Sequence, residues 1–440
     1  MVGPQRREFL QQAGIGLAGA AAIAATATSR ATAAANEKIV FGAIGCGGQG
    51  SFLARSFAAQ PDAVVAYVCD PDRARAEKLA GEIKEIQQRA PEIVEDLRKV
   101  LDDKSVDAVT VGTPDHWHAP ATILACAAGK HVYVEKPCSH NIREGRLMIE
   151  AARKHNRVVQ VGTQSRSAAH IRKAAELLKS GAIGDVLVAK AWNSQRRGSI
   201  GHGAPSEPPA GFNHDLWVGP APLVPFQANR QHYGWHWWYA FGTGDMGNDG
   251  VHDIDIARFG LGVETHPSSI AAIGGKYAYD DDQQFPDTQY VVFEYPGDGK
   301  VGHKRQLIYE QRLWSNYVQE GFENGNAYYG TNGMLLLGKK EGWKLFGPKN
   351  QLRDSMSAEA LGPPHHRNFI ECVRSGERPN ADIEINHLST ALCHLGNIAC
   401  RVGRRLEFDP VAEQFKGDEE ANALVRREYR DGHWAVPVGV

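Results

Sequence analysis

A histidine surrounded by acidic residues stands in residues 242–255, which read GTGDMGNDGVHDID. Asp249 and Asp255 each lie three residues from His252, so either carboxylate can share a helix face with the imidazole. A carboxylate there would raise the pKa of the imidazole and orient the ring. We therefore expect His252, assisted by Asp249, to act as a general base that accepts a substrate proton, an assistance worth about 100- to 10,000-fold. A buried, hydrogen-bonded histidine at a helix start is the alternative.

A glycine-rich turn is the second chemical signal. The stretch GCGGQG matches G-x-G-x-x-G and supplies Gly45, Gly47, Gly48, Gln49 and Gly50. Such glycines let the backbone approach a pyrophosphate at the positive end of the following helix. Asp70 comes 20 residues after the last glycine, where an acid binds the ribose hydroxyls and repels a 2′-phosphate. We therefore predict an NAD site, with NADP less favoured; a tight turn without ligand is the alternative.

Both signals need elements that hold them in place. Short β-rich runs are expected at residues 38–44, 64–69, 108–111, 131–134 and 158–161, and helices at 71–90, 118–128 and 143–155. Strands that alternate with helices in this way are typical of a parallel sheet with right-handed crossovers. Residues 36–160 are therefore predicted to form an α/β domain, the doubly wound Rossmann sheet that binds NAD.

The pattern changes in the second part of the chain. A helix is expected at residues 171–179 and strands at 186–192, 270–273, 290–294 and 306–309. These runs favour an α+β domain with a large open, mainly antiparallel sheet. We assign residues 161–410 to this substrate-binding domain and residues 411–440 to a C-terminal tail. Residues 198–225 are expected to form an ordered loop over the site, or else a flexible surface insertion.

Two further motifs follow strands at their carboxyl ends, where ligands bind in open α/β sheets. One contains Thr113, Pro114, His116, Trp117 and His118, and the other contains Glu135, Lys136 and Pro137. Together with the glycine motif, they resemble the glucose-fructose oxidoreductase and inositol dehydrogenase family, Gfo/Idh/MocA, from about residue 38 to 410. The resemblance implies that these residues line the cofactor site, to which we also assign Gln164.

The same resemblance implies roles in the reaction. Lys136 would lie between nicotinamide and substrate and hydrogen-bond the reacting hydroxyl; burial beside a cationic ring would lower its proton affinity. His252 takes the histidine position of the family's D-x-x-x-H element. Asn248 stands where inositol dehydrogenases carry aspartate, so Asp245 and Asp249 are the candidate supporting acids. We expect Asp245, Asn248 and His252 to contact a substrate whose identity this departure leaves open.

An aromatic run, YGWHWWY at residues 233–239, precedes this element. Its rings could stack on the C–H face of a pyranose while His236 or Tyr239 bonds hydroxyls, so Trp238 and Tyr239 are assigned to substrate binding. Core packing is the alternative for each ring. The histidine pairs at residues 116 and 118 and at residues 365 and 366 lack a third ligand at ordinary spacing, so no metal site is predicted.

Residues 1–35 are typical of an export signal. A twin-arginine run, RREFL, begins at Arg6, an apolar Ala/Gly-rich stretch follows at residues 13–27, and small residues at 31–35 offer a cleavage site. The apolar stretch is too short and too weakly hydrophobic to span a bilayer, which takes about 20 apolar residues. We expect export through the twin-arginine machinery to the periplasm or the exterior, folded with the cofactor in place. A disordered, Ala-rich tail is the alternative.

Composition excludes several classes of partner. The chain of 440 residues has 49 lysines and arginines against 51 acids, a formal net charge of -2. Balanced charge without long like-charge blocks argues against nucleic acid and anionic membrane surfaces. The seven cysteines are scattered and none form C-x-x-C, so neither a disulfide framework nor a zinc knuckle is predicted.

Three functions remain open at this point. The leading hypothesis is an NAD-dependent oxidoreductase that oxidises a secondary hydroxyl of a sugar, glycoside or cyclitol. A rival in the same family keeps NAD bound and recycles it, so that elimination or epimerisation follows oxidation. A third hypothesis is a non-catalytic sensor of nucleotide or sugar on the same fold. The tail at 411–440 could also exchange between subunits of a homo-oligomer, a hypothesis that a monomeric mass by light scattering would overturn.

Overall fold

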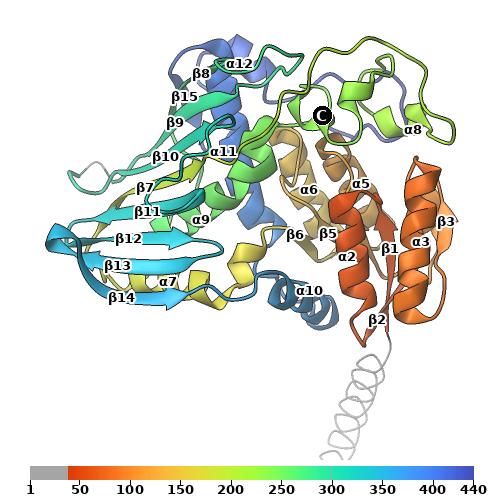
Figure 1. Ribbon diagram of the computed structural model, residues 1–440, viewed down its shortest axis with the longest axis horizontal. Helices are drawn as coiled ribbons and strands as arrows, with labels where there is room; N and C mark the ends of the chain where they lie inside the picture. The colour runs from red at the N-terminus through yellow and green to blue at the C-terminus, as the bar shows by residue number, and fades with distance from the viewer. Residues whose placement is uncertain (1–37, 299) are drawn as a thin grey trace, which may run out of the picture.

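The computed structural model describes residues 38–298 and 300–440, so the leader expected at residues 1–35 lies outside the described residues. Two β-sheets form the body of the molecule, one of six strands and one of ten. They lie beside each other in Figure 1, with α6 (Ile142–Lys154), α9 (Val251–Leu261) and α11 (Ile383–Val402) between them. The fold class predicted from the sequence is confirmed.

The first sheet is parallel throughout, with the order β3-β2-β1-β4-β5-β6. Its strands are β1 (Ile39–Ile44), β2 (Ala63–Cys69), β3 (Glu92–Val94), β4 (Ala108–Val111), β5 (His131–Val134) and β6 (Val159–Val161). Its other helices are α2 (Gly48–Ala58), α3 (Arg73–Gln87), α4 (Leu97–Asp102) and α5 (Asp115–Ala127). The order reverses between β1 and β4, and their carboxyl ends mark the switch point where such folds bind ligands.

Helix α10 (Gly362–Ser375) joins the later part of the chain to this first sheet. Its Phe369 is fully buried and packs on Phe57 of α2 and Phe41 of β1, with ring centroids 5.9 and 6.1 Å away. Burying one such phenylalanine contributes roughly 1.5–3 kcal/mol. A helix that follows most of the second sheet in sequence therefore completes the core of the nucleotide domain.

The second sheet has the order β14-β13-β12-β11-β7-β10-β9-β8-β15-β16 and is antiparallel except between β7 and β10. Its strands are β7 (Val186–Asn193), β8 (Ser269–Gly275), β9 (Thr288–Tyr295), β10 (Arg305–Arg312), β11 (Asn324–Gly330), β12 (Gly333–Gly338), β13 (Gly342–Gly347), β14 (Gln351–Ser357), β15 (Leu406–Asp409) and β16 (Gln414–Phe415). The helical segments around it are η1 (Gln164–Ser167), α7 (Ala169–Lys179), α8 (His214–Val218), η2 (Ala228–Arg230), η3 (Gly234–Trp237), the π-helical turn η4 (Met246–Gly250), η5 (Pro348–Asn350) and α12 (Glu419–Ala423).

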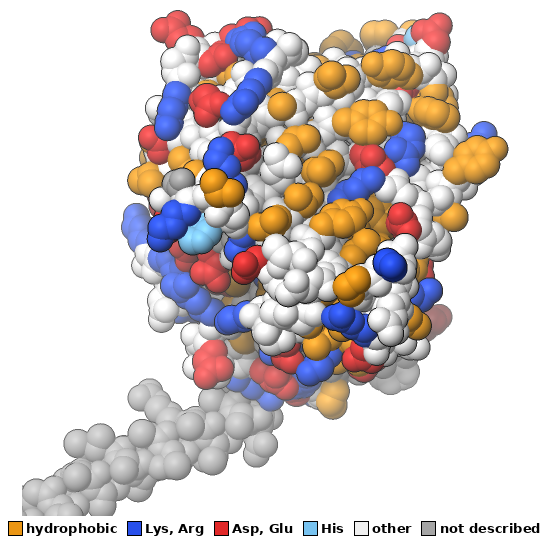
Figure 2. Space-filling model, turned by 90° about the vertical axis from the view of Figure 1, so that its left-hand side faces the viewer, with side chains coloured by type: hydrophobic (Ala, Val, Ile, Leu, Met, Phe, Trp, Pro, Cys, Tyr) orange, Lys and Arg blue, Asp and Glu red, His pale blue; other side chains and the backbone are white. Residues whose placement is uncertain are grey.

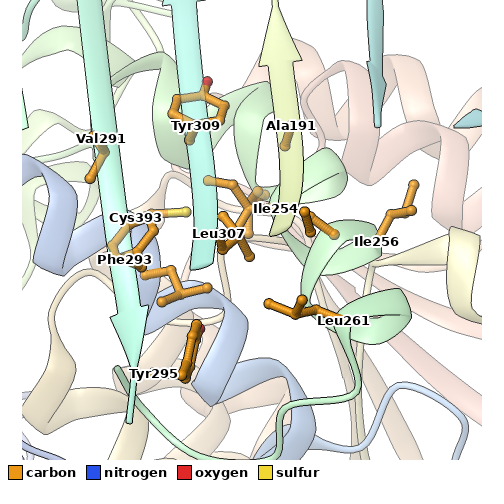
Figure 3. Close-up of a cluster of buried hydrophobic side chains, with 14 of the residues drawn as sticks. Ala191, Ile254, Ile256, Leu261, Val291, Phe293, Tyr295, Leu307, Tyr309 and Cys393 are labelled. Atoms are coloured by element: carbon orange, nitrogen blue, oxygen red, sulfur yellow. The ribbon is translucent and has the colours of Figure 1, made fainter. Parts of the chain in front are cut away.

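A buried apolar cluster holds α9 between the second sheet and α11 (Figure 3). Ile254 and Ile256 of α9 are at most 2% exposed. Leu307 and Tyr309 of β10 belong to the same cluster, because alternate residues of a strand point to one face of its sheet. This packing fixes the start of α9, which carries His252.

The outer side of the second sheet carries apolar groups among charged ones. Figure 2 shows hydrophobic side chains scattered over this side of the molecule, and Ile273, Tyr290 and Tyr329 are exposed on its strands. In residues 38–298 and 300–440, no helix has both the length and the hydrophobicity to cross a membrane.

The tail at residues 411–440 packs on its own chain. Arg427 forms a buried ion pair with Glu144 of α6, at 2.6 Å between Nη2 and Oε1. Ala435 is buried in the apolar core of the nucleotide domain. These contacts anchor the tail, and its exchange between subunits stays a prediction.

Candidate active site

The glycine-rich turn between β1 and α2 is shaped for close backbone approach. Gly45 has φ +89°, and a Cβ there would lie 2.6 Å from the carbonyl oxygen of Gly112 at the end of β4. A Cβ on Gly50 would lie 2.0 Å from the Gly45 carbonyl oxygen. Gly47 precedes α2 without a side-chain cap, so the first N–H groups of the helix are free to receive an anion. The turn therefore fits the pyrophosphate of a dinucleotide.

A cavity of about 380 Å³ opens at this switch point. Of the residues predicted to hold the cofactor, those lining it are Gly45, Gly47, Gly48, Gln49, Asp70, Thr113, Pro114, Trp117, His118, Glu135 and Lys136. Three predicted residues, Gly50, His116 and Gln164, are not among its lining residues. Gly50 supports the turn, His116 lies 3.0 Å from the Trp217 carbonyl oxygen through Nε2, and Gln164 approaches the Tyr133 hydroxyl.

Asp70 lies where the predicted ribose-binding acid should lie, after β2. Its carboxylate accepts hydrogen bonds from the backbone N–H groups of Cys46, at 2.6 Å, and Asp72, at 2.8 Å. Burial raises the pKa of Asp70 to about 6, despite these two bonds. Arg75 of α3 lines the same part of the cavity and was not predicted from the sequence.

The Glu135 carboxylate is fixed between the glycine turn and β6. Gln49 donates to it at 2.8 Å through Nε2. A Cβ on Gly162 would lie 2.6 Å from its oxygens, so the glycine leaves room for the carboxylate. Burial raises the pKa of Glu135, and the adjacent Lys136 opposes that shift.

Lys136 and the π-helical turn η4 meet at one end of the cavity. The Lys136 ammonium donates to the backbone carbonyl of Asn248 at 2.5 Å. Asn248 also lines the cavity, and its side-chain amide donates to Asp245 at 2.9 Å. Asn248, which stands where inositol dehydrogenases carry aspartate, is therefore part of the site. The carboxylate that it binds, Asp245, lies three residues earlier.

His252 lies at the first turn of α9, is half-buried, and is not among the residues that line the cavity. The sequence predicted that a nearby carboxylate would raise its pKa, and Asp249 does raise it, but other groups outweigh this effect. Burial lowers the pKa of His252 well below its ordinary value, the Lys339 and Lys136 cations lower it further, and Asp249 opposes them only in part. The ring is consequently neutral at physiological pH and able to accept a proton.

The three neighbouring acids have different surroundings. Asp249 accepts from Asn324 at 2.7 Å and lies 3.4 Å from the Lys339 ammonium. Burial would raise its pKa, but Lys339 and other cations lower it below the ordinary value. Asp245 is fully buried beside Arg197, at 3.0 Å. Asp255, the other acid predicted to share a face with the histidine, instead forms a buried ion pair with a different arginine in η1.

The aromatic run contributes His236, one of the residues proposed to bond hydroxyls, and two rings that were not singled out. Tyr233, Trp235 and His236 line the cavity. Trp238 and Tyr239 do not: the Trp238 ring lies under Arg230, 4.2 Å from the guanidinium, and the Tyr239 hydroxyl donates to the backbone of a loop. The 3₁₀ turn η3 rotates the run so that its earlier residues face the site.

Part of the loop predicted to lie over the site covers the nucleotide end of the cavity. The Gly211 carbonyl oxygen accepts a hydrogen bond from the Arg73 backbone N–H at 3.0 Å, and the Asn213 N–H donates to the Pro71 carbonyl oxygen at 2.8 Å. Further along, His232 lies 3.1 Å from the Asp72 carboxylate. Trp434, from the tail, also lines the cavity and lies 4.3 Å from the Arg98 guanidinium.

One further cluster lies outside the cavity. In residues 38–298 and 300–440, potential metal ligands come together at His266, His387 and Glu413. Both imidazole Nε2 atoms lie within 2.8 Å of Glu413 Oε1, and Arg146 donates to the same oxygen at 2.6 Å. The group therefore ties the tail, through Glu413, to Arg146 of α6 and His387 of α11. Its members are distant in sequence, and spacing gives no sign of them.

The cradle for a dinucleotide, with a lysine at its end and a neutral histidine in the adjoining helix, is what a nucleotide-dependent oxidoreductase requires. Residues 39–163 match the model of the oxidoreductase family with an NAD-binding Rossmann fold, GFO_IDH_MocA. Residues 182–296 and 338–436 match that family's C-terminal alpha/beta domain. The chain belongs to the Gfo/Idh/MocA family.

Relatives and solved structures agree with this assignment. The chain is 30% identical to myo-inositol 2-dehydrogenase of Thermotoga maritima over 84% of its length and 98% of the relative's. It is 27% identical to scyllo-inositol 2-dehydrogenase (NAD(+)) of Bacillus subtilis over 76% of this chain and 86% of that one. The structure of aldose-aldose oxidoreductase from Caulobacter crescentus has the same fold, with a TM-score of 0.65 and 18% identity over 84% of this chain and 100% of that one.

Proposed function

We propose that the protein oxidises a secondary hydroxyl of a sugar, glycoside or cyclitol by hydride transfer to NAD. The observation that carries the proposal is that Lys136, which lines one end of the nucleotide cavity, binds the π-helical turn that leads into α9 and lowers the pKa of the neutral His252 at the start of that helix. The inositol dehydrogenases among its relatives support a polyol substrate. Mixing NAD-loaded protein with a panel of polyols and following nicotinamide reduction tests it.

Each residue has a separate task in the proposed reaction. Bound NAD would supply the hydride acceptor. Lys136, held by the Asn248 carbonyl, donates a hydrogen bond to the substrate oxygen and fixes the reacting carbon. His252 takes the hydroxyl proton on a ring nitrogen, so that the oxygen can form the carbonyl. Asp249 does not line the cavity; its carboxylate acts on the imidazole of His252, where it favours the protonated form and partly offsets the lysine cations.

We also propose that Asp70 makes the protein prefer NAD to NADP. Because its pKa is about 6, the carboxylate is ionised at neutral pH and repels a 2′-phosphate, and it becomes neutral as the pH falls below 6. Asp70→Asn is expected to tighten NADP binding at neutral pH by about tenfold, with NAD affinity changed much less. Titration of both nucleotides into each protein checks this.

Acidification supplies the second half of that test. The wild-type protein should gain NADP affinity below pH 6, because Asp70 becomes neutral there. In Asp70→Asn, the only pH dependence of NADP affinity that remains should be that caused by titration of the nucleotide's own phosphate. Equal pH dependence in the two proteins would mean that Asp70 does not discriminate.

The covered cavity favours a second candidate, in which NAD stays bound and is recycled within each turnover. The Asn213 and Arg73 backbone bonds and Trp434 all close the nucleotide end. Trp434→Ala is expected to speed nucleotide dissociation by about tenfold, because an aromatic wall is lost, and Trp434→Phe to preserve retention. Nucleotide released on denaturing dialysed protein measures this. Wild-type protein that emerges empty from dialysis would remove the support for recycling.

We further propose that the protein reaches the periplasm or the exterior through the twin-arginine machinery, on the basis of the sequence signature beginning at Arg6. Replacing both arginines of that signature with lysines should leave the protein in the cytoplasmic fraction. Unchanged export of this variant would refute the proposal.

A further inference from the structure

One of two adjacent lysines in a hairpin turn points into the protein. Lys339 and Lys340 lie in the turn between β12 and β13. The Lys340 side chain is exposed, as is usual for lysine in a turn. The Lys339 side chain is only 12% exposed and reaches across to the start of α9.

The Lys339 ammonium binds two carboxylates there. It lies 3.0 Å from Asp253 Oδ2 and 3.4 Å from Asp249 Oδ1. Asn324 of β11 donates to the other oxygen of Asp249, at 2.7 Å. Strand β11 and the turn between β12 and β13 thus hold the carboxylate that precedes His252 by three residues.

We propose that Lys339 is a positioning residue of the active site: its ammonium holds the Asp249 carboxylate and sets the electrostatic field in which His252 accepts a proton. This rests on the proposed role of His252 as the base. Lys339 does not line the cavity, so it acts on the substrate only through these neighbours.

The charged groups facing His252 come from several elements. Lys136 follows β5 and Lys339 follows β12, and both disfavour a second positive charge on the imidazole. Asp249 of η4 favours that charge, and His365 of α10 disfavours it weakly. Removing the Lys339 cation leaves Lys136 as the main opposing charge and frees Asp249 to act more strongly.

The remaining charged groups near His252 form ion pairs with one another. Arg197 lies 3.0 Å from Asp245 and 3.7 Å from Asp249. Burial raises the pKa of Asp253 to about 7, with the Lys339 cation opposing the rise. Loss of Lys339 would therefore raise the pKa of Asp253 further and favour its neutral form, so Asp253 would add no negative charge beside the imidazole.

The sign of the effect follows from these charges. In Lys339→Met the imidazole loses a repelling cation and gains a freer carboxylate, so the pKa of His252 should rise toward its ordinary value of about 6.5. Lys339→Arg keeps the charge and should behave as wild type. Lys340→Met is the matched control, since it removes an equal charge from the adjacent exposed position.

The test reads His252 directly and needs no substrate. Diethyl pyrocarbonate reacts with a histidine only when its imidazole is neutral. The rate of His252 modification against pH, followed by peptide mass spectrometry, therefore reports the protonation of this residue. The midpoint should rise by about one pH unit or more in Lys339→Met, and stay in place in Lys340→Met and Lys339→Arg. Lys339→Gln gives the same comparison if the methionine variant does not fold.

The outcomes separate two claims. An unchanged midpoint in a folded, uncharged variant would overturn the role of Lys339. A raised midpoint in a protein that oxidises no sugar or polyol would support that role while rejecting the proposed function. In active protein, the acid limb of kcat should move with the midpoint, whereas a purely structural role would lower kcat without moving it.

Discussion

Lys136→Met is expected to lower kcat/KM by about 1,000-fold while the protein keeps its nucleotide. Methionine retains the length of the side chain, but it cannot donate to a substrate oxygen, and losing one such donor typically costs 100- to 1,000-fold. The bond to the Asn248 carbonyl is lost as well, so the reacting hydroxyl is also less well placed. Steady-state rates on the best polyol, with nucleotide content measured after denaturation, check both parts.

A charge-matched control keeps this result specific. Lys99 of α4 is exposed and lines no part of the cavity, so Lys99→Met should leave both rate and nucleotide content unchanged. A Lys136→Met protein within about twofold of wild type would remove this lysine from the mechanism.

His252→Ala is expected to lower kcat by about 100- to 10,000-fold and to abolish the acid limb of the pH profile. In the wild type, burial and the two lysine cations lower the pKa of the ring. Activity should therefore hold as the pH falls through about 6.5, where an ordinary histidine would protonate, and be lost only at lower pH. Profiles of kcat and kcat/KM for both proteins measure this.

Added imidazole provides the complementary observation. A small base that enters the space left by the side chain should restore part of the rate in His252→Ala and none in Lys136→Met. If the acid limb persists in His252→Ala, another group is the base, and the assignment fails.

The local parts of the fold could be predicted from the sequence. The five predicted strands of the first sheet and four of the second are present, because each carries a continuous β-rich run. The sequence did not reveal β3 or the six strands β11 to β16. Glycine and asparagine in β11, residues 324–330, and the charged turns that follow this strand weaken the β pattern of the sequence. Pairing with β7 therefore stabilises a strand that intrinsic propensity alone would not predict.

The site residues also fall into those that local sequence motifs predict and those that only tertiary packing brings together. Local motifs located the glycine turn and Asp70, because their spacing in one crossover unit fixes their spacing in space. Arg197, Lys339 and Trp434 come from separate segments, so only tertiary packing brings them to the nucleotide and the histidine. Of the aromatic run, His236 was singled out and lines the cavity, whereas Trp238 and Tyr239 do not, because the turn η3 has no local sequence signal.

The central claim is that this cavity transfers hydride from a neutral polyol to NAD. Its most direct test is a single-turnover experiment, in which NAD-loaded protein is mixed with a panel of cyclitols, sugars and glycosides and the near-ultraviolet absorbance of reduced nicotinamide is followed. The account predicts an absorbance rise with at least one compound, up to one equivalent per bound nucleotide, that is absent in Lys136→Met. Stoichiometric nucleotide binding with no rise for any compound would contradict it and would favour a sensing protein on this fold.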